Sequence, residues 1–555
     1  MTPEQLSDLV VEVVRAAVEA GELTLEPSDL PSDGRIERPR SREHGDWATS
    51  VAMTLAKPAG AAPRAVAEVI APRLAASAGI VKVDVAGPGF LNITLDAAAA
   101  GELASAIVEA GESFGHGDTL AGVRVNVEFI SANPTGPLHL GHTRWAAVGD
   151  AIARVLAAQG AEVDREFYIN DRGSQMEKFG LSIMAAANGR PVPEDGYHGG
   201  YIVDLAAEIL EAHPEFLALP DDAQSTAFRE AGYERQLAQQ RAVLALFRTH
   251  FDVWASERAL HESGAVERGL EKLRGEGHVV ELDGAVWLRT TDFGDDKDRV
   301  LVKADGEFTY FASDTAYYVD KRARGFDLNI YLLGADHHGY VNRLRAVAAC
   351  AGDDMDRNVE VLIGQLVKMM KNGEEVRLSK RAGTLILLED LVDEVGVDAA
   401  RYTLIRYPVD SPLTLDLDLL IKRTNDNPVF YVQYAHARIC SVLRSADELG
   451  IDWRGTGLDP SLLTDEREAA LLASLAAFPG VVASAAELRE PHRVARYLED
   501  LGTAYHRFYD TCRVLPRGDE PLEPLHIARL WLCAATRQVI ANGLALCGVE
   551  APERM

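Results

Sequence analysis

Residues Val123 to Gly160 read VRVNVEFISANPTGPLHLGHTRWAAVGDAIARVLAAQG and decide the fold of this 555-residue chain. The first eight of them alternate apolar and polar side chains, which predicts a strand, and a loop rich in Pro and Gly follows. Beyond the loop, apolar side chains from Trp145 to Leu156 recur at helical spacing, and Gly160 stands where a C-terminal cap belongs. The stretch therefore predicts a strand, a loop and a helix in succession.

His139 and His142 stand at the junction between that loop and that helix. The first turn of a helix has unpaired N–H groups and the positive end of the helix dipole, so it attracts phosphate. Imidazoles at these positions add donors, and Gly141 has no side chain to keep a flat base from the backbone. The junction predicts a nucleotide site; the alternative is that the histidines are capping or surface residues. A zinc site is disfavoured because no third ligand stands at zinc spacing.

A second polar segment, EVRLSKRAGT at Glu375 to Thr384, carries cations at Arg377, Lys380 and Arg381. In-line attack on a nucleoside triphosphate needs cations on the departing pyrophosphate, and a lysine on a loop can supply one. The segment therefore predicts a phosphate-binding loop. The alternative is a solvated basic turn.

Together, the two segments resemble the HIGH and KMSKS motifs of class I aminoacyl-tRNA synthetases, in the same order along the chain. Over nearly its whole length the chain is similar to the arginyl-tRNA synthetases of that class. The segments that carry this resemblance are SANPTGPLHLGH (131–142), FYINDRGSQ (167–175), FTYFASDTAYY (308–318), GADHHGY (334–340), VDAARYTLIR (397–406), EHGDWATSVA (43–52) and VAGPGFLNITL (85–95).

Two residues depart from the family's pattern, since Arg377 replaces the first lysine of KMSKS and Leu378 replaces the methionine. The second lysine is present as Lys380. Some members of the family that lack this second lysine carry one just before HIGH, where this chain has Gly136. Lys380 is therefore the residue that we expect to act.

The resemblance implies three groups of site residues. The expected catalytic residues are His139, His142 and Lys380, and the expected ATP contacts add Leu140, Gly141 and Ser379. The HIGH region comprises Ala132, Asn133, Pro134, Thr135, Gly136, Pro137, Leu138 and the HLGH residues 139–142. The expected arginine contacts are Glu128, Asn133, Tyr310, Asp314 and His337, of which His337 stands where some members have glutamine.

The chemistry of arginine agrees with the acidic residues of this set. A guanidinium presents a planar fork of donors, so its pocket should offer carboxylates. Tyr310 and Asp314 are four residues apart on a predicted helix, which places both on one face. For each acid, the alternative is a solvent-facing charge or a pair on a helix surface.

The chain is longer than one hydrophobic core usually supports, which predicts several domains. Residues 1–112 resemble the family's N-terminal domain, an α+β unit that binds the tRNA elbow. Residues 113–400 alternate strands and helices, which predicts a doubly wound, Rossmann-like parallel sheet, with a helix-rich insertion at about 190–290. Residues 401–555 are predicted as helices and resemble the family's anticodon-binding bundle.

Composition limits the compartment and the partners. The five cysteines form no C-x-x-C pair, so we expect neither a disulfide framework nor a zinc site. The N-terminus lacks a signal-type apolar core and no long apolar run follows, which predicts a cytoplasmic protein without membrane contact. The net charge of −29 disfavours non-specific RNA binding, but from Ile421 onward basic residues nearly match acidic ones.

The sequence therefore predicts a ligase that joins L-arginine to its tRNA through an arginyl-adenylate, with ATP as substrate and Mg²⁺ on its phosphates. Its expected partners are L-arginine, ATP and the tRNA for arginine, and we expect a monomer. Three alternatives stay open: a class I synthetase for another amino acid such as lysine or glutamate, a small-molecule nucleotidyltransferase, and a non-catalytic tRNA-binding paralogue.

Overall fold

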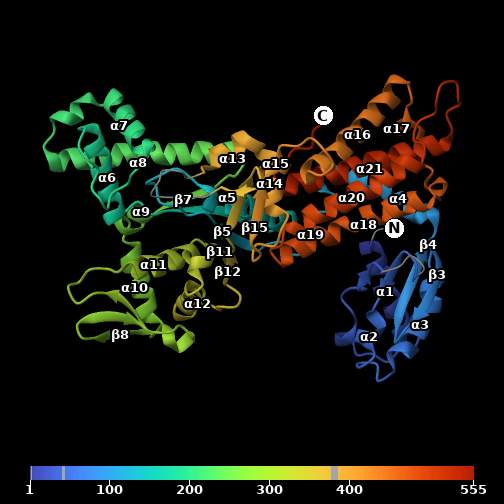
Figure 1. Cartoon of the computed structure of the whole chain (residues 1–555). Coiled ribbons are helices and arrows are strands. Elements are labelled where there is room, and N and C mark those ends of the chain that lie inside the picture. Colours follow the sequence, from blue (N-terminus) through green and yellow to red (C-terminus); the bar gives the residue numbers. More distant parts are fainter. Residues whose placement is uncertain (2, 40–43, 377–385) are drawn as a thin grey trace.

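The computed structural model describes residues 1, 3–39, 44–376 and 386–555, and the molecule is elongated (Figure 1). A parallel sheet lies in the middle. Helices α6 (Ser174–Ala187), α7 (Gly200–Ala212) and α8 (Asp221–Leu246) extend from it toward one end. A helical bundle and the N-terminal sheet form the other end. This arrangement confirms the predicted fold class: a doubly wound central unit, an α+β N-terminal part and a helical C-terminal part.

Five parallel strands form the central sheet, in the spatial order β12-β11-β5-β6-β7. Their bounds are β5 Arg124–Glu128, β6 Glu162–Ile169, β7 Val253–Ser256, β11 Leu328–Gly334 and β12 Val359–Gly364. Numbered along the chain, the strands lie in the order 3-2-1-4-5, as in a doubly wound nucleotide-binding fold. The order reverses between β5 and β11. Ligands of such folds bind beyond the carboxyl ends of the strands at this switch point.

The helix α5 (Leu140–Ala158) returns the chain from β5 to β6 and is buried along nearly its whole length. Gly149 lets α5 approach the residue after β5, since a Cβ at this position would lie 2.4 Å from the ring of Phe129. Close packing therefore fixes the start of α5 at the carboxyl edge of the sheet.

The chain leaves the central sheet twice before β11. Between β6 and β7, helices α6, α7 and α8 pack on one another around Phe179, Ile183 and Phe228. After β7 come α9 (Glu257–Glu262), α10 (Ala265–Gly275) and an antiparallel sheet of β8 (Val279–Leu282), β9 (Ala285–Leu288) and β10 (Arg299–Val302). The expected insertion at about 190–290 thus contains β7, which is an edge strand of the central sheet.

Helices α11 (Tyr310–Ala323) and α12 (Tyr340–Cys350) flank β11 in the sequence. After β12, a small sheet has the order β14-β13-β15, with bounds Glu374–Glu375, Val367–Lys371 and Leu413–Asp416. Between β14 and β15 lie α13 (Leu388–Val395) and α14 (Val397–Ile405), and α15 (Leu417–Leu420) follows β15.

The N-terminal part is an antiparallel sheet with helices α1 (Pro3–Glu19), α2 (Val51–Leu55) and α3 (Pro63–Ala75). Its strand order is β1-β2-β4-β3, with bounds Ile36–Glu37, Trp47–Thr49, Phe90–Leu95 and Ile80–Ala86. Apolar side chains of α1 and α3, including Val10, Val14 and Ile70, are fully buried. The amphipathic first helix therefore serves as part of this small core.

The C-terminal bundle consists of α16 (Pro428–Glu448), α17 (Trp453–Thr456), α18 (Glu466–Ala476), α19 (Phe478–Glu487), α20 (His492–Thr511) and α21 (Pro524–Leu546). Helix α4 (Ala97–Ala110) also belongs to it, because it packs against α18 and α21. The side-chain amide of Asn542 donates to the carbonyls of Gly111 and Phe114 over 2.9 and 3.0 Å. A segment from before the central sheet is thus held by the last helix.

One stretch of the bundle, Glu466–Glu487, is long and apolar enough to cross a membrane by length and composition, with a mean hydropathy of 1.9. The prediction that no long apolar run follows the N-terminus is therefore wrong for this stretch. In the fold this stretch is two helices, α18 and α19, and its side chains Leu471, Leu475 and Val482 are fully buried in the core. Core helices of globular proteins have this composition too.

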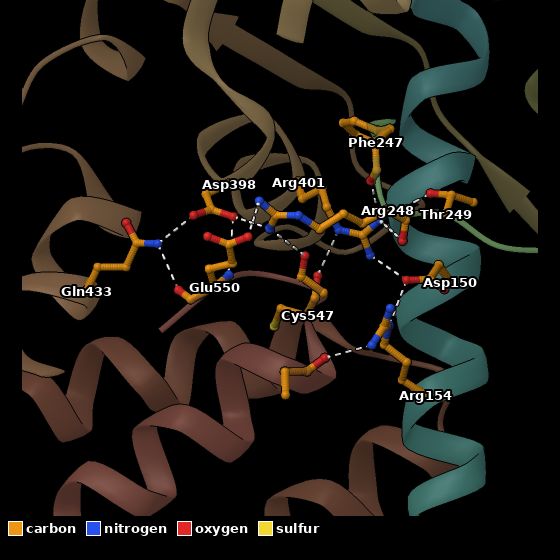
Figure 2. A network of polar contacts seen from close by, with 12 residues as sticks. Asp150, Arg154, Phe247, Arg248, Thr249, Asp398, Arg401, Gln433, Cys547 and Glu550 are labelled. Atoms are coloured by element: carbon orange, nitrogen blue, oxygen red, sulfur yellow. Dashed lines mark hydrogen bonds and ion pairs between the residues drawn. The ribbon is translucent and has the colours of Figure 1, made fainter. Parts of the chain in front are cut away.

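A network of polar contacts joins the central unit to the bundle (Figure 2). Its centre is Arg401 on α14, whose side chain is fully buried. The guanidinium donates to the carboxylate of Asp150 on α5 over 2.6 Å and to the carbonyls of Phe247 and Cys547 over 2.9 and 3.1 Å. Helix α5, the end of α8 and the end of α21 therefore meet on one side chain.

Candidate active site

The HLGH segment lies where α5 begins, at the carboxyl edge of β5. His139 is the N-cap residue, and its Nδ1 accepts from the N–H of Gly141 over 3.1 Å. The Nδ1 of His142 accepts from the N–H of His139 over 3.2 Å, and the two ring centroids lie 4.1 Å apart. The capping role considered from the sequence is thus present. It also puts the proton of each neutral ring on Nε2, as a donor suited to phosphate.

Gly141 is required by this arrangement. A Cβ built on it would lie 2.9 Å from Cε1 and 3.1 Å from Nδ1 of His139. Any side chain at this position would therefore displace the first imidazole from the helix start. Gly141, which we expect to leave room for a nucleotide, also leaves room for the imidazole of His139 that caps the helix.

Residues 386–388, which follow the cationic segment in the sequence, pair with the HLGH segment. The N–H of Leu140 donates to the carbonyl of Ile386 over 3.0 Å, and the N–H of Leu388 donates to the carbonyl of Leu138 over 2.9 Å. These bonds form an antiparallel bridge between His139 and Leu387. The chain that leaves the loop thus passes directly beside the two histidines.

The rest of the HIGH region is held by the helices between β6 and β7. The buried Gln240 of α8 donates from Nε2 to the carbonyls of Asn133 and Gly136 over 3.1 and 2.8 Å. The hydroxyl of Tyr201 on α7 donates to the carbonyl of Thr135 over 3.0 Å. The helices that extend from the sheet thus support the loop that leads into HLGH.

Glu128 ends β5 beside the switch point, and its side chain is buried. Its Oε1 accepts from the Ser131 hydroxyl over 2.9 Å, and its Oε2 accepts from the Lys321 ammonium over 2.6 Å. Ser131 has a left-handed φ of 45°. The expected arginine-binding carboxylate is therefore paired with a lysine of the protein itself.

Asp314 and His337 both lie next to Tyr340. Asp314 stands one turn into α11 and accepts from the Tyr340 hydroxyl. Burial, together with the charge of Glu128 nearby, raises the pKa of Asp314 to about 6. His337 ends a short 3-10 turn directly after β11, and its ring centroid lies 6.3 Å from that of Tyr340, edge to face. These two expected arginine contacts thus approach the switch point from different segments.

Tyr310 begins α11, where its side chain is 68% exposed, and lines a cavity of about 880 Å³. Its hydroxyl lies against Gly173, which has a φ of +82°, since a Cβ there would be 3.1 Å from the oxygen. Asn133 donates from Nδ2 to Gln175 Oε1 over 2.6 Å. Tyr310 and Asp314 lie in the first two turns of one helix, as expected. The side chain of Asn133 contacts Gln175 of α6.

The structure adds two acids that the sequence analysis does not name. Glu257 follows β7 at the carboxyl edge of the sheet, is buried, and lines the same cavity as Tyr310. Burial and the charge of Asp314 raise the pKa of Glu257 to about 7. Asp171 follows β6 and accepts from the Tyr233 and Ser256 hydroxyls over 3.1 and 2.7 Å. Recognition of VWAS as a central strand would have pointed to Glu257, because ligand-binding residues follow strand ends.

The cationic loop lies outside the described residues, and with it Ser379, Lys380, Arg377 and Leu378. No group of three or more His, Cys, Asp or Glu side chains placed to hold a metal ion occurs among residues 1, 3–39, 44–376 and 386–555. All five cysteines are buried thiols.

Three family models match consecutive parts of the chain. They are the arginyl-tRNA synthetase N-terminal domain (residues 4–95), the catalytic domain of class I (R) tRNA synthetases (residues 106–195 and 237–406) and the DALR anticodon-binding domain (residues 432–555). Among solved structures, the fold is similar to arginyl-tRNA synthetases from Thermus thermophilus (TM-score 0.74, 23% identity) and Plasmodium falciparum (TM-score 0.73, 16% identity), each covering 100% of both chains.

Curated relatives are more similar in sequence. The arginine–tRNA ligases of Kineococcus radiotolerans and Frankia alni are each 58% identical to this chain, with 100% of both proteins covered. The alignments span the N-terminal sheet, the central unit and the bundle together. The chain therefore belongs to the arginyl-tRNA synthetases, a family of class I aminoacyl-tRNA synthetases.

Proposed function

We propose that this protein attaches L-arginine to its cognate tRNA at the expense of ATP, through an arginyl-adenylate. The observation that carries this proposal is the pairing of two sites at one switch point. A helix start with two imidazole donors and an acidic pocket lie at one edge of the sheet. This pocket comprises the cavity that Glu257 lines and the neighbouring carboxylates of Asp314 and Glu128. The first suits a triphosphate and the second suits a guanidinium.

In the first step, a carboxylate oxygen of arginine attacks the α-phosphorus of ATP, and the bond from that phosphorus to the bridging oxygen breaks to release pyrophosphate. His139 and His142 would donate from Nε2 to phosphate oxygens. Lys380 would neutralise the departing pyrophosphate. Catalysis would come from positioning and from charge stabilisation, without a covalent bond to the protein.

In the second step, a ribose hydroxyl at the 3′ end of the tRNA attacks the arginyl carbonyl and AMP leaves. ATP enters as its magnesium complex, so the metal arrives with the substrate. The arginine side chain would lie in the acidic pocket. Tyr310 and Asp314 on α11 and His337 after β11 would provide its polar contacts from two different segments.

The remainder of the chain provides the surface for the tRNA. The N-terminal sheet would contact the elbow, and the helices from α16 to α21 would bind the anticodon. In that bundle, Tyr434 stacks on Phe430, and the guanidinium of Arg438 lies 5.1 Å from the ring centroid of Tyr434. Aromatic and arginine planes of this kind bind unstacked bases. We propose domain boundaries at about 112 and 400, and a cytoplasmic monomer.

The decisive experiment is aminoacylation of total tRNA with each of the twenty amino acids in parallel. We expect charging with arginine alone, and only when ATP is present. Charging with lysine or glutamate instead would assign the protein to another class I specificity. Binding of tRNA without any charging would identify a non-catalytic paralogue and refute the proposal.

A further inference from the structure

Lys321 is a buried cation beneath the acidic pocket. It lies on the last turn of α11, seven residues after Asp314, and its side chain is 0% exposed. Its ammonium lies 2.6 Å from Glu128 Oε2 and 4.5 and 4.2 Å from the ring centroids of Tyr317 and Tyr331. A charge this deep is costly unless a partner compensates it. That partner is the carboxylate that ends β5.

A second buried acid also lies near Lys321. Glu166 on β6 accepts two bonds of 2.9 Å from the Arg324 guanidinium, together with bonds from Tyr317 and Asn126. Although burial opposes it, the charges of Lys321 and Arg324 hold the pKa of Glu166 below its ordinary value. The hydrogen bond of the Lys321 ammonium goes to Glu128, which ends β5 beside the switch point.

We propose that Lys321 is a positioning residue for arginine specificity: it pairs with the Glu128 carboxylate and holds it in one orientation for the substrate guanidinium. This inference rests on the proposed arginine site. An ionised carboxylate offers about four lone-pair positions. Within the part of the chain that the structure describes, Ser131 takes one on Oε1 and Lys321 takes one on Oε2. One lone-pair position on each carboxylate oxygen is then left to accept a bidentate pair of hydrogen bonds from the substrate guanidinium.

The charges around the pocket explain why a fixed cation is needed. Burial and the charge of Glu128 raise the pKa of Asp314, and burial and the charge of Asp314 raise the pKa of Glu257. Lys321 offsets one negative charge of this group from a fully buried position that does not line the cavity. The group as a whole is then less negative while the pocket is empty.

A purely structural pair would behave differently. A buried ion pair contributes little net stability, and a neutral pair of similar volume often serves the fold equally well. If Lys321 acts only in the fold, its removal lowers thermal stability and leaves the preference for a charged substrate unchanged. If it acts through Glu128, it controls how well the enzyme distinguishes arginine from citrulline, its neutral isostere.

The test compares Lys321→Met, Lys321→Arg, Glu128→Gln and the double variant Lys321→Met/Glu128→Gln. The measurements are kcat and KM for arginine and for ATP in aminoacylation, the inhibition constant of citrulline, and thermal stability. We expect Lys321→Met to raise the KM for arginine about 10- to 100-fold, with the KM for ATP within about twofold. Lys321→Arg should recover most of the arginine affinity, and Lys321→Met should lose most of the discrimination against citrulline.

The double variant decides the mechanism even if Lys321→Met does not fold, because it leaves no buried charge without a partner. We expect its arginine KM to lie within about threefold of that of Glu128→Gln alone, since one carboxylate mediates both effects. An additive loss would overturn the proposal, and so would a Lys321→Met enzyme that keeps its arginine affinity and its selectivity. Unchanged arginine affinity in Glu128→Gln would overturn it too, whereas a wild-type enzyme that does not charge arginine would refute the proposed function itself.

Discussion

The N–H of Leu140 and the carbonyl of Ile386 are joined by a hydrogen bond of 3.0 Å, although 246 residues separate them in the chain. The bond ties the second residue of HLGH to the segment that follows the cationic loop. The segment that follows the cationic residues in the sequence is thereby fixed beside the two histidines.

Replacement of His142 by Ala should lower kcat for aminoacylation about 100- to 1000-fold, because one donor to the transition state is lost. The same change removes the acceptor for the N–H of His139, so a helix cap is lost as well, at about 1 kcal/mol. Thermal unfolding separates the two effects. His142→Asn, which keeps an acceptor, is the matched control and should restore stability without restoring the rate. Near-normal turnover in both variants would refute the nucleotide role.

Replacement of Lys380 by Ala should reduce the rate of adenylate formation far more than the affinity for arginine, because its charge acts on the departing pyrophosphate. Arg377→Ala in the same loop should have a smaller effect. Pyrophosphate exchange and equilibrium binding of arginine provide the two readings. A larger defect in Arg377→Ala would identify Arg377, which replaces the first lysine of KMSKS, as the cation that acts on the pyrophosphate.

Asp314→Asn should weaken arginine binding by at least tenfold and leave ATP affinity nearly unchanged, since the amide keeps the shape but loses the charge. Calorimetry with each ligand separately gives both values. The control is Glu177→Gln, an exposed carboxylate that lines the cavity together with Tyr310 and Glu257. An equal loss of arginine affinity in the control would mean that the cavity acts through its overall charge rather than through Asp314.

Arginine binding should strengthen as the pH rises from 5 to 8. The pKa values of Asp314 and Glu257 are raised to about 6 and about 7 in the empty site, so each is mostly protonated at about pH 5. A guanidinium requires the ionised forms, so binding should release protons, which calorimetry in buffers of different ionisation enthalpy counts. The sign for folding is opposite: without ligand, these two groups lower the free energy of unfolding as the pH rises from about 4 to about 7. The control is the double variant Asp314→Asn/Glu257→Gln, whose arginine affinity should not change with pH over this range. A wild-type enzyme whose arginine affinity is equally independent of pH would contradict this linkage.

Gly548→Ala should destabilise the junction around Arg401. A Cβ at this position would lie 2.2 Å from Nη2 of Arg401, and Gly548 has a φ of +65°. We expect a loss of about 2–5 kcal/mol in the free energy of unfolding, from backbone strain and overpacking together. Gly518→Ala is the control, because Gly518 has a φ of +54° but no described atom lies within 4 Å of its Cβ position. Equal losses in the two variants would show that only the backbone matters.

Local patterns predicted much of the fold. The period of apolar residues placed α5 and the long helices of the bundle, and the strand-loop-helix pattern put His139 at the helix start, where it caps the first turn. The apolar stretch Glu466–Glu487 lies in the segment that is predicted as helical, and the fold divides it into α18 and α19. Patterns with a short period are set by neighbours in the sequence, which is why they can be read from it.

Features that depend on long-range contacts could not be predicted in this way. The strand β7 is short and follows a long helical segment, so its place in the central sheet was not apparent, and Glu257 was missed with it. Lys321 reads as one charge among several at a helix end, and only the fold brings it to Glu128, which lies 193 residues earlier. The same holds for α4, which precedes the central unit in the sequence but packs in the bundle.

The carbonyl of Cys547 that Arg401 binds is synthesised 146 residues after Arg401 itself. At about 5–20 residues per second, translation reaches it roughly 7–30 s later. During this interval the nascent chain holds Asp150 and Arg401 without the segment that closes over them. The junction is thus completed only after this later segment has left the ribosome, and a polypeptide released before Cys547 would carry every residue of the proposed site yet lack the contact that locks α14 to the bundle.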